Sequence, residues 1–186
     1  MGQDRAVESL KGQLLVASAD LSDPNFRRAV VLVTEHDDDG ALGVILNRPA
    51  ETTVAEAVPP LAELVENEEP VYVGGPVDQG SVIVLAQFDD PEEAAATIFE
   101  DVGFVSGDAD LDELPEAIRQ ARVFAGYAGW AAGQLDAELE ADGWIVEPAI
   151  ADDVFGPSDE LWSDVLRRKG GPYALLATMP PDPSLN

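Results

Sequence analysis

The sequence predicts an α+β fold, with one domain whose mainly antiparallel or mixed sheet is flanked by helices. A chain of 186 residues, 46% of them apolar, has the size of one domain and can bury a core without metal ions or disulfides. Two apolar β-type runs, 29–34 and 41–46, surround the turn sequence Asp37-Asp38-Asp39-Gly40 and predict a hairpin. Hairpins and scattered helices exclude a regular strand–helix alternation, which disfavours a doubly wound parallel fold.

The N-terminal half is predicted to consist mainly of strands. Thr53 and Glu56 match a capping box and predict a helix to about Val58, followed by a further helical turn over 61–65. The other elements expected, in order, are a strand over 13–18, a loop over 19–26 around Asp23-Pro24-Asn25, strands over 29–34 and 41–46, and strands over 71–73 and 81–86 that pair antiparallel with each other.

The C-terminal half is predicted to mix short strands with three helices. The second of these helices is expected because Ala131, Leu135 and Leu139 form an i, i+4, i+8 apolar stripe. The helices are expected over 110–120, from about 129 to Gly143, and around 161–166, the last capped by Ser158 and stopped by Gly170-Gly171-Pro172. The strands are expected over 97–99, 103–105, 122–125 and 144–146.

The chain is expected to hold one domain between two tails. Residues 1–9 form the N-terminal tail, residues 10–179 the domain, and residues 180–186 a Pro-rich tail. The N-terminus has no apolar core of signal-peptide length, and no apolar run approaches the roughly 20 residues that span a bilayer. The absence of cysteine excludes disulfides, thiolate metal sites and a cysteine nucleophile. We therefore expect a cytoplasmic protein that does not associate with membranes.

The charge balance is strongly acidic, with 10 Lys and Arg against 37 Asp and Glu and a formal net charge of −27. Such a field repels nucleic acids and anionic lipid, so no nucleic-acid partner is expected. The only basic clusters, Arg27-Arg28 and Arg167-Arg168-Lys169, are interpreted as solvated ends of helices or strands. The acid excess keeps a protein soluble at high salt and destabilises its compact state at low salt.

Known catalytic signatures are absent from the sequence. There is no Walker-type phosphate loop, no G-x-G-x-x-G and no G-x-S-x-G elbow, and His36 is the only histidine. The run Glu35 to Gly40 invites a metal interpretation, but EF-hand spacing would place Leu46 where a bidentate glutamate belongs. The same residues are those that a hairpin turn needs. We therefore predict no metal site and no cofactor.

Two segments are the best candidates for a concave site. The first is a predicted junction between a strand and a helix at 126–133, where Gly126, Tyr127, Gly129 and Trp130 cluster. Helix N–H groups there can bind an anion, or the glycines can instead allow close helix–sheet packing around aromatic core residues. The second candidate is Asn47 with Arg48, whose guanidinium can hold a carboxylate or phosphate, or form an internal ion pair.

The sequence contains, in this order, the segments Asp23 to Arg28, Glu35-His36, Gly40 to Gly43, Asn47-Arg48-Pro49, Val73-Gly74-Gly75-Pro76, Gly126 to Trp130, Gly133-Gln134-Leu135, Trp144, Phe155 and Trp162. Taken together, these segments resemble the AlgH/YqgE family of bacterial proteins. The resemblance covers about residues 10–180 and implies one α+β domain with a bifurcated, partly barrel-like sheet, but no established reaction, cofactor or catalytic residue. Family members commonly carry a histidine in the strand after the Gly-Gly-Pro turn, and Val84-Leu85-Ala86-Gln87 has none.

The function that these observations favour is a non-enzymatic binding or regulatory module. Its predicted ligand-binding residues are Asn47, Arg48, Gly74, Gly75, Gly126, Tyr127, Gly129 and Trp130, which are expected to converge at strand ends. The expected partner is a small anionic ligand or another protein. The alternative is a hydrolase acting on a small anionic substrate, although no nucleophile or general base can be assigned. A DNA-binding regulator ranks last, and the oligomeric state is left open.

Overall fold

The structure is a computed structural model that describes residues 9–18, 21 and 24–178. The two predicted tails fall outside these residues except for Ser9, and the predicted loop 19–26 is described only in part. Within the described part of the chain, no helix is both long and apolar enough to cross a membrane.

Ten strands form the central sheet of the described residues. Eight of them follow the order β10-β1-β2-β3-β9-β6-β8-β7; β5 also pairs with β9, and β4 pairs with β5. All pairings are antiparallel except that between β5 and β9. The strands are β1 (Gln13–Ala17), β2 (Val30–Asp37), β3 (Gly40–Ile45), β4 (Pro49–Thr53), β5 (Pro70–Val73), β6 (Val77–Phe88), β7 (Ala96–Phe99), β8 (Val102–Phe104), β9 (Ile118–Ala131) and β10 (Trp144–Pro148).

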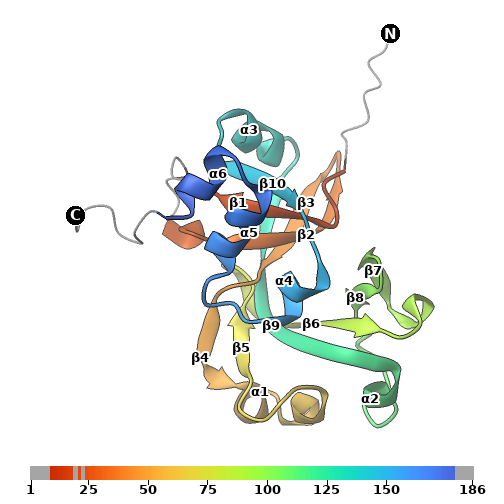
Figure 1. Cartoon of the computed structure of the whole chain (residues 1–186). Coiled ribbons are helices and arrows are strands. Elements are labelled where there is room, and N and C mark those ends of the chain that lie inside the picture. The colour runs from red at the N-terminus through yellow and green to blue at the C-terminus, as the bar shows by residue number, and fades with distance from the viewer. Residues whose placement is uncertain (1–8, 19–20, 22–23, 179–186) are drawn as a thin grey trace.

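Strand β9 is the point at which the sheet divides. Along one edge its residues 128–131 pair with β3, while Phe124 and Ala125 pair with β5. Along the other edge β6 pairs with β9 from Ile118 to Tyr127. Figure 1 shows β9 crossing the molecule from the β6–β8 wing to the β1–β3 wing. The predicted α+β class and bifurcated, mainly antiparallel sheet are confirmed, and the sheet stays open instead of closing into a barrel.

Helices cover both faces of this sheet. Alternate residues of β1 and β2 supply two separate cores: Leu14 and Leu32 face the core that α4 and α5 close, whereas Leu15 and Val31 face the core that α3 closes. The α-helices are α1 (Val54–Ala57), α2 (Leu114–Ala117), α3 (Gln134–Glu140), α4 (Ala151–Phe155), α5 (Leu161–Lys169) and α6 (Pro172–Leu176), and the 3₁₀ turns are η1 (Pro24–Phe26), η2 (Pro59–Leu64) and η3 (Pro91–Glu93).

Several local predictions are confirmed. The β2–β3 hairpin turns at the predicted Asp-Gly sequence. Thr53 caps α1 by accepting a hydrogen bond from the Glu56 N–H at 3.2 Å. The short strands expected near 97–99 and 103–105 are present as β7 and β8, which pair antiparallel.

Three predictions about the strands and helices around β9 are wrong. β5 and β6 do not pair with each other, because both pair with β9 instead. The predicted helix over 110–120 shrinks to α2, and β9 starts at Ile118. The predicted helix from Gly129 begins only at Gln134, since β9 continues to Ala131. Burial alternates over 128–131, which is the period of a strand, and the pairing with β3 decides the conformation.

The C-terminal region contains two helices that the sequence analysis does not predict. α5 forms as expected, but Ser158 does not cap it through its side chain, which instead lies 3.4 Å from the Tyr72 hydroxyl. α4 precedes α5, and α6 follows it after Gly170-Gly171. Both missed helices have five residues, too few to show a helical period.

Candidate functional site

The backbones of three predicted site residues, Arg48, Gly74 and Gly126, come together at the middle of β9, the strand that contains Gly126. The Val73 N–H donates to the Arg48 carbonyl at 2.7 Å, and the Gly74 N–H donates to the Ala125 carbonyl at 2.8 Å. These bonds place the end of β5 between the start of β4 and the middle of β9.

The glycines at this place allow close packing of backbone on backbone. A Cβ atom added to Gly74 would lie 2.4 Å from the Gly126 carbonyl oxygen, and one added to Gly75 would lie 2.1 Å from the Tyr127 carbonyl. Gly126 itself has φ +74°, a left-handed conformation that favours glycine. The contacts fit the packing role that the sequence left open beside the ligand-binding role. Gly129 differs, because an added Cβ there makes only ordinary contacts with Leu42 at 3.7 Å.

The side chains of Asn47 and Arg48 both form hydrogen bonds with backbone groups of residues 27–30, where the chain enters β2. Asn47 accepts a hydrogen bond from the Val30 N–H at 3.0 Å and donates to the Arg28 carbonyl at 2.9 Å. Arg48 donates from Nη2 to the Arg27 carbonyl, and burial lowers the pKa of its guanidinium. Both side chains therefore anchor the segment that leads into β2.

Tyr127 and Trp130 point to opposite faces of β9. Tyr127 is half-buried against the α4–α5 core, whereas Trp130 is buried in the α3 core. The Nε1–H groups of Trp130 and Trp144 donate to the same Glu138 oxygen at 3.0 and 2.9 Å. Trp130 is thus a core residue whose polar atom is satisfied within the fold.

His36 is buried at the side of the β2–β3 hairpin. Its Nδ1 accepts a hydrogen bond from the Leu10 N–H at 2.9 Å, and its Nε2 lies 3.9 Å from Asp136. Among the residues that the structure describes, no three His, Asp or Glu side chains are arranged to hold a metal ion.

A hollow of about 410 Å³ lies elsewhere, between η2, the first half of β9 and the turn from α4 to α5. Its walls combine apolar side chains with two arginines and two glutamates. The lining residues are Leu64, Val65, Glu66, Glu69, Arg119, Gln120, Ala121, Arg122, Phe155, Gly156 and Pro157.

Arg122 is the buried charge of this hollow, with only 5% of its side chain exposed. Its Nη1 donates to the carbonyls of Val154 and Gly156 at 2.9 and 3.0 Å, and its Nη2 donates to that of Phe155 at 3.0 Å. The guanidinium also lies 4.4 Å from the Tyr72 ring centroid. It therefore binds the carbonyl end of α4, where a cation is favourable.

One edge of the Arg122 guanidinium remains without a hydrogen bond. A guanidinium has five N–H groups, and three of those on Arg122 donate to carbonyls. Its Nε is buried without a partner among the described residues. The carboxylate of Glu69 lies 3.8 Å from Nη2, which is an ion-pair distance but too long for a hydrogen bond. Nε and one N–H of Nη2 are therefore left.

The neighbouring polar side chains are already committed. Arg119 forms ion pairs with Asp89 at 3.1 Å and Asp101 at 3.3 Å on the rim of the hollow. Gln120 donates to the Gln87 side chain at 2.8 Å. Arg122 is thus the buried cation of the lining, whereas Arg119 is an exposed cation on its rim.

Arg122 is absent from the predicted site residues, although the sequence carried a signal for it. It opens the apolar run Arg122-Val123-Phe124-Ala125, which was predicted as a strand. A charge within a buried strand needs a partner, because an unpaired buried charge is costly. What the sequence could not supply is the partner, since α4 lies some thirty residues further on.

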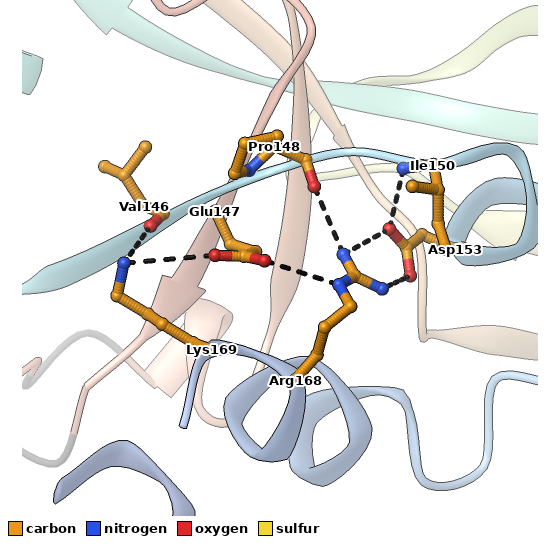
Figure 2. Close-up of polar contacts among 7 residues, drawn as sticks. All are labelled: Val146, Glu147, Pro148, Ile150, Asp153, Arg168 and Lys169. Atoms are coloured by element: carbon orange, nitrogen blue, oxygen red, sulfur yellow. Dashed lines mark hydrogen bonds and ion pairs between the residues drawn. The ribbon is translucent and has the colours of Figure 1, made fainter. Parts of the chain in front are cut away.

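A second buried charge is held at the other end of α4 (Figure 2). Arg168 donates to both oxygens of Asp153, and Asp153 also accepts a hydrogen bond from the Ile150 N–H at 2.9 Å. Arg168 and Lys169 both lie within 4 Å of Glu147 on β10. The interpretation of this basic cluster as a solvated helix end is confirmed, because all three residues are exposed in the last turn of α5, and Arg168 and Lys169 form these ion pairs in addition.

Comparison with known proteins places the chain in a family. Residues 14–174 match the family model described as AlgH-like, DUF179. The chain belongs to the AlgH-like family. The resemblance found in the sequence is thereby confirmed. The family is uncharacterised, and no function is established for it.

Relatives of the AlgH-like family match nearly the whole chain. A UPF0301 protein of Thermobifida fusca is 46% identical over 190 residues, covering 96% of each chain. A UPF0301 protein of Mycobacterium avium is 43% identical over 181 residues, covering 94% of this chain and 90% of the relative.

Two solved structures share the fold of this chain. A crystal structure from Corynebacterium diphtheriae has a TM-score of 0.86 at 32% identity, covering 92% of this chain and 93% of that one. The solution structure of AlgH from Pseudomonas aeruginosa has a TM-score of 0.71 at 28% identity, covering 92% and 94%.

Proposed function

We propose that this AlgH-like protein is a cytoplasmic, non-enzymatic binding module whose ligand site is the hollow at Arg122. The ligand is a small molecule with an anionic group. The single observation that carries the proposal is a buried arginine beside a hollow with two N–H groups left over, one of them the unpartnered Nε. Buried donors are normally satisfied, so such a pair points to a partner outside the chain.

The surroundings of Arg122 support binding more than catalysis. The three carbonyl bonds and the Tyr72 ring fix its plane, which suits recognition of an anion. A general base or nucleophile would have to lie within hydrogen-bond reach of a substrate held there. Of the two glutamates that line the hollow, Glu69 is already the ion-pair partner of Arg122, at 3.8 Å from Nη2.

The predicted residues Asn47, Arg48, Gly74, Gly75, Gly126, Tyr127, Gly129 and Trp130 stay a prediction for a second site. The Arg122 hollow is preferred because Arg48 already donates to a backbone carbonyl and the glycines pack against each other.

The proposal is tested by titrating ¹⁵N-labelled protein with small carboxylates, phosphates and sulfonates, one at a time. We expect saturable shifts of the Arg122 Nε–H and of the Gly156 amide. Shifts gathered at Arg48 and Gly75 would instead move the site to the predicted residues. No saturable shift with any anion at millimolar concentration would refute the proposal.

A further inference from the structure

We infer that the Arg122 hollow selects a carboxylate and discriminates against phosphate groups. The carboxylate binds the edge of the Arg122 guanidinium that the Glu69 side chain now faces. The inference rests on the proposed function and names the chemical class of its ligand. Three features of the hollow carry it: the free edge of the guanidinium, the charges around it and the apolar walls.

The free edge of Arg122 has the shape of a carboxylate receptor. Nε and Nη2 are neighbours on a planar group, and their remaining N–H groups can meet two coplanar oxygens side by side. The bonds to Val154, Phe155 and Gly156 hold the guanidinium from the opposite end, so its plane is fixed before a ligand arrives. Preorganisation of this kind lowers the ordering cost of binding.

The charges around the hollow favour one negative charge over two. Its lining contains two cations, Arg119 and Arg122, and two anions, Glu66 and Glu69. Arg119 is already paired with two aspartates. A phosphate monoester carries up to two negative charges at neutral pH, so it meets more repulsion from the glutamates than a carboxylate does.

Glu69 acts as an internal substitute for the ligand. Its carboxylate faces Nη2 at 3.8 Å, close enough for attraction but without the hydrogen bonds that a carboxylate at this edge would form. An incoming carboxylate must displace it and is repelled by it. Loss of the Glu69 charge should therefore tighten binding, even where a polar side chain remains at this position.

The remainder of the ligand meets an apolar wall. The apolar part of the lining, beside the charged residues, consists of Leu64, Val65, Phe155 and Pro157. A volume of about 410 Å³ lies within the range of small-molecule sites. The fitting ligand is therefore a small molecule with one carboxylate and a short apolar body.

The test compares butanoate, propyl phosphate and butanamide, which share a short alkyl chain, by calorimetry at about pH 8, where the phosphate is a dianion. Wild type, Glu69→Gln and Glu63→Gln are used. Glu63 lies on the nearby η2 turn, is exposed and does not line the hollow, so its variant controls for net charge. Arg122→Lys serves as a loss-of-site variant, provided its circular dichroism is native.

We expect butanoate to bind at least about tenfold more tightly than the other two probes, and Glu69→Gln to tighten butanoate about tenfold while Glu63→Gln changes it less than about twofold. Arg122→Lys should lose binding. Propyl phosphate binding as tightly as butanoate overturns the selectivity and leaves the proposed function standing. An unchanged affinity in Glu69→Gln overturns the role of Glu69. If butanamide binds as tightly as butanoate, or if no anion binds at all, both proposals are overturned.

Discussion

The Arg168 guanidinium binds the buried Asp153 carboxylate through two hydrogen bonds, of 2.9 and 2.8 Å. Only 4% of the Asp153 side chain is exposed, and its Oδ2 also receives the backbone N–H of Ile150. The hydrogen bonds to Asp153 raise the pKa of Arg168, so its guanidinium stays charged throughout the neutral range. The start of α4 is thereby attached to the end of α5 and to β10 (Figure 2).

Asp153→Asn should lower the free energy of unfolding by about 2–3 kcal/mol, since Arg168 loses its bidentate partner while it keeps contact with solvent and Glu147. Urea denaturation measures the change. Asp152→Asn is the matched control, because Asp152 is exposed on the same helix, and it should change stability by less than about 0.5 kcal/mol. Equal effects of the two substitutions would show that the pair contributes nothing specific.

Glu138→Ala should destabilise the protein by about 2–4 kcal/mol. The substitution leaves the indole N–H groups of Trp130 and Trp144 without an acceptor in a mostly buried cluster. Denaturation followed by tryptophan fluorescence reports both stability and the surroundings of the indoles. Glu140→Ala, on the exposed side of the same helix, is the control. A native-like stability for Glu138→Ala would mean that other acceptors replace the carboxylate.

Gly74→Ala should cost at least about 3–4 kcal/mol or prevent folding. Its Cβ would lie 2.4 Å from the Gly126 carbonyl oxygen, so β5 and β9 would have to separate. Gly80→Ala is the control, since an added Cβ there has no described atom within 4 Å. Thermal unfolding of the two variants makes the comparison. A stable Gly74→Ala protein would argue against close packing as the role of this glycine.

Stability should increase when KCl is raised from low to molar concentration. At a formal net charge of −27, screening relieves repulsion among the carboxylates in the compact state. The melting temperature measured by calorimetry is expected to rise with KCl. A flat or falling dependence would exclude self-repulsion as a significant term in the stability of this protein.

The sequence predicted what depends on local patterns. The β2–β3 hairpin follows from an Asp-Gly turn between apolar runs, and α1 from the cap at Thr53, because both signals involve residues only a few positions apart. It failed at Gly129 to Ala131, where small residues suit a helix and a strand equally and the pairing with β3 decides between them.

The candidate site could not be predicted from the sequence for a similar reason. The charge of Arg122 in an apolar strand was visible, but its partners come from α4 and from the loop between η2 and β5, which only the fold brings beside β9. The predicted meeting of Gly74 with Gly126 is present, because both glycines lie where strands approach closely.

Strand β9 belongs to both wings of the sheet, which bears on how the protein can unfold and be divided. Neither wing is complete without β9. Cutting the chain at Gly126 would separate β3 from its partner strand in one wing, and Val77 of β6 from Tyr127 in the other. We expect the two wings to unfold together in one cooperative transition. Fragments ending or beginning near Gly126 should remain unfolded alone and regain structure only when mixed.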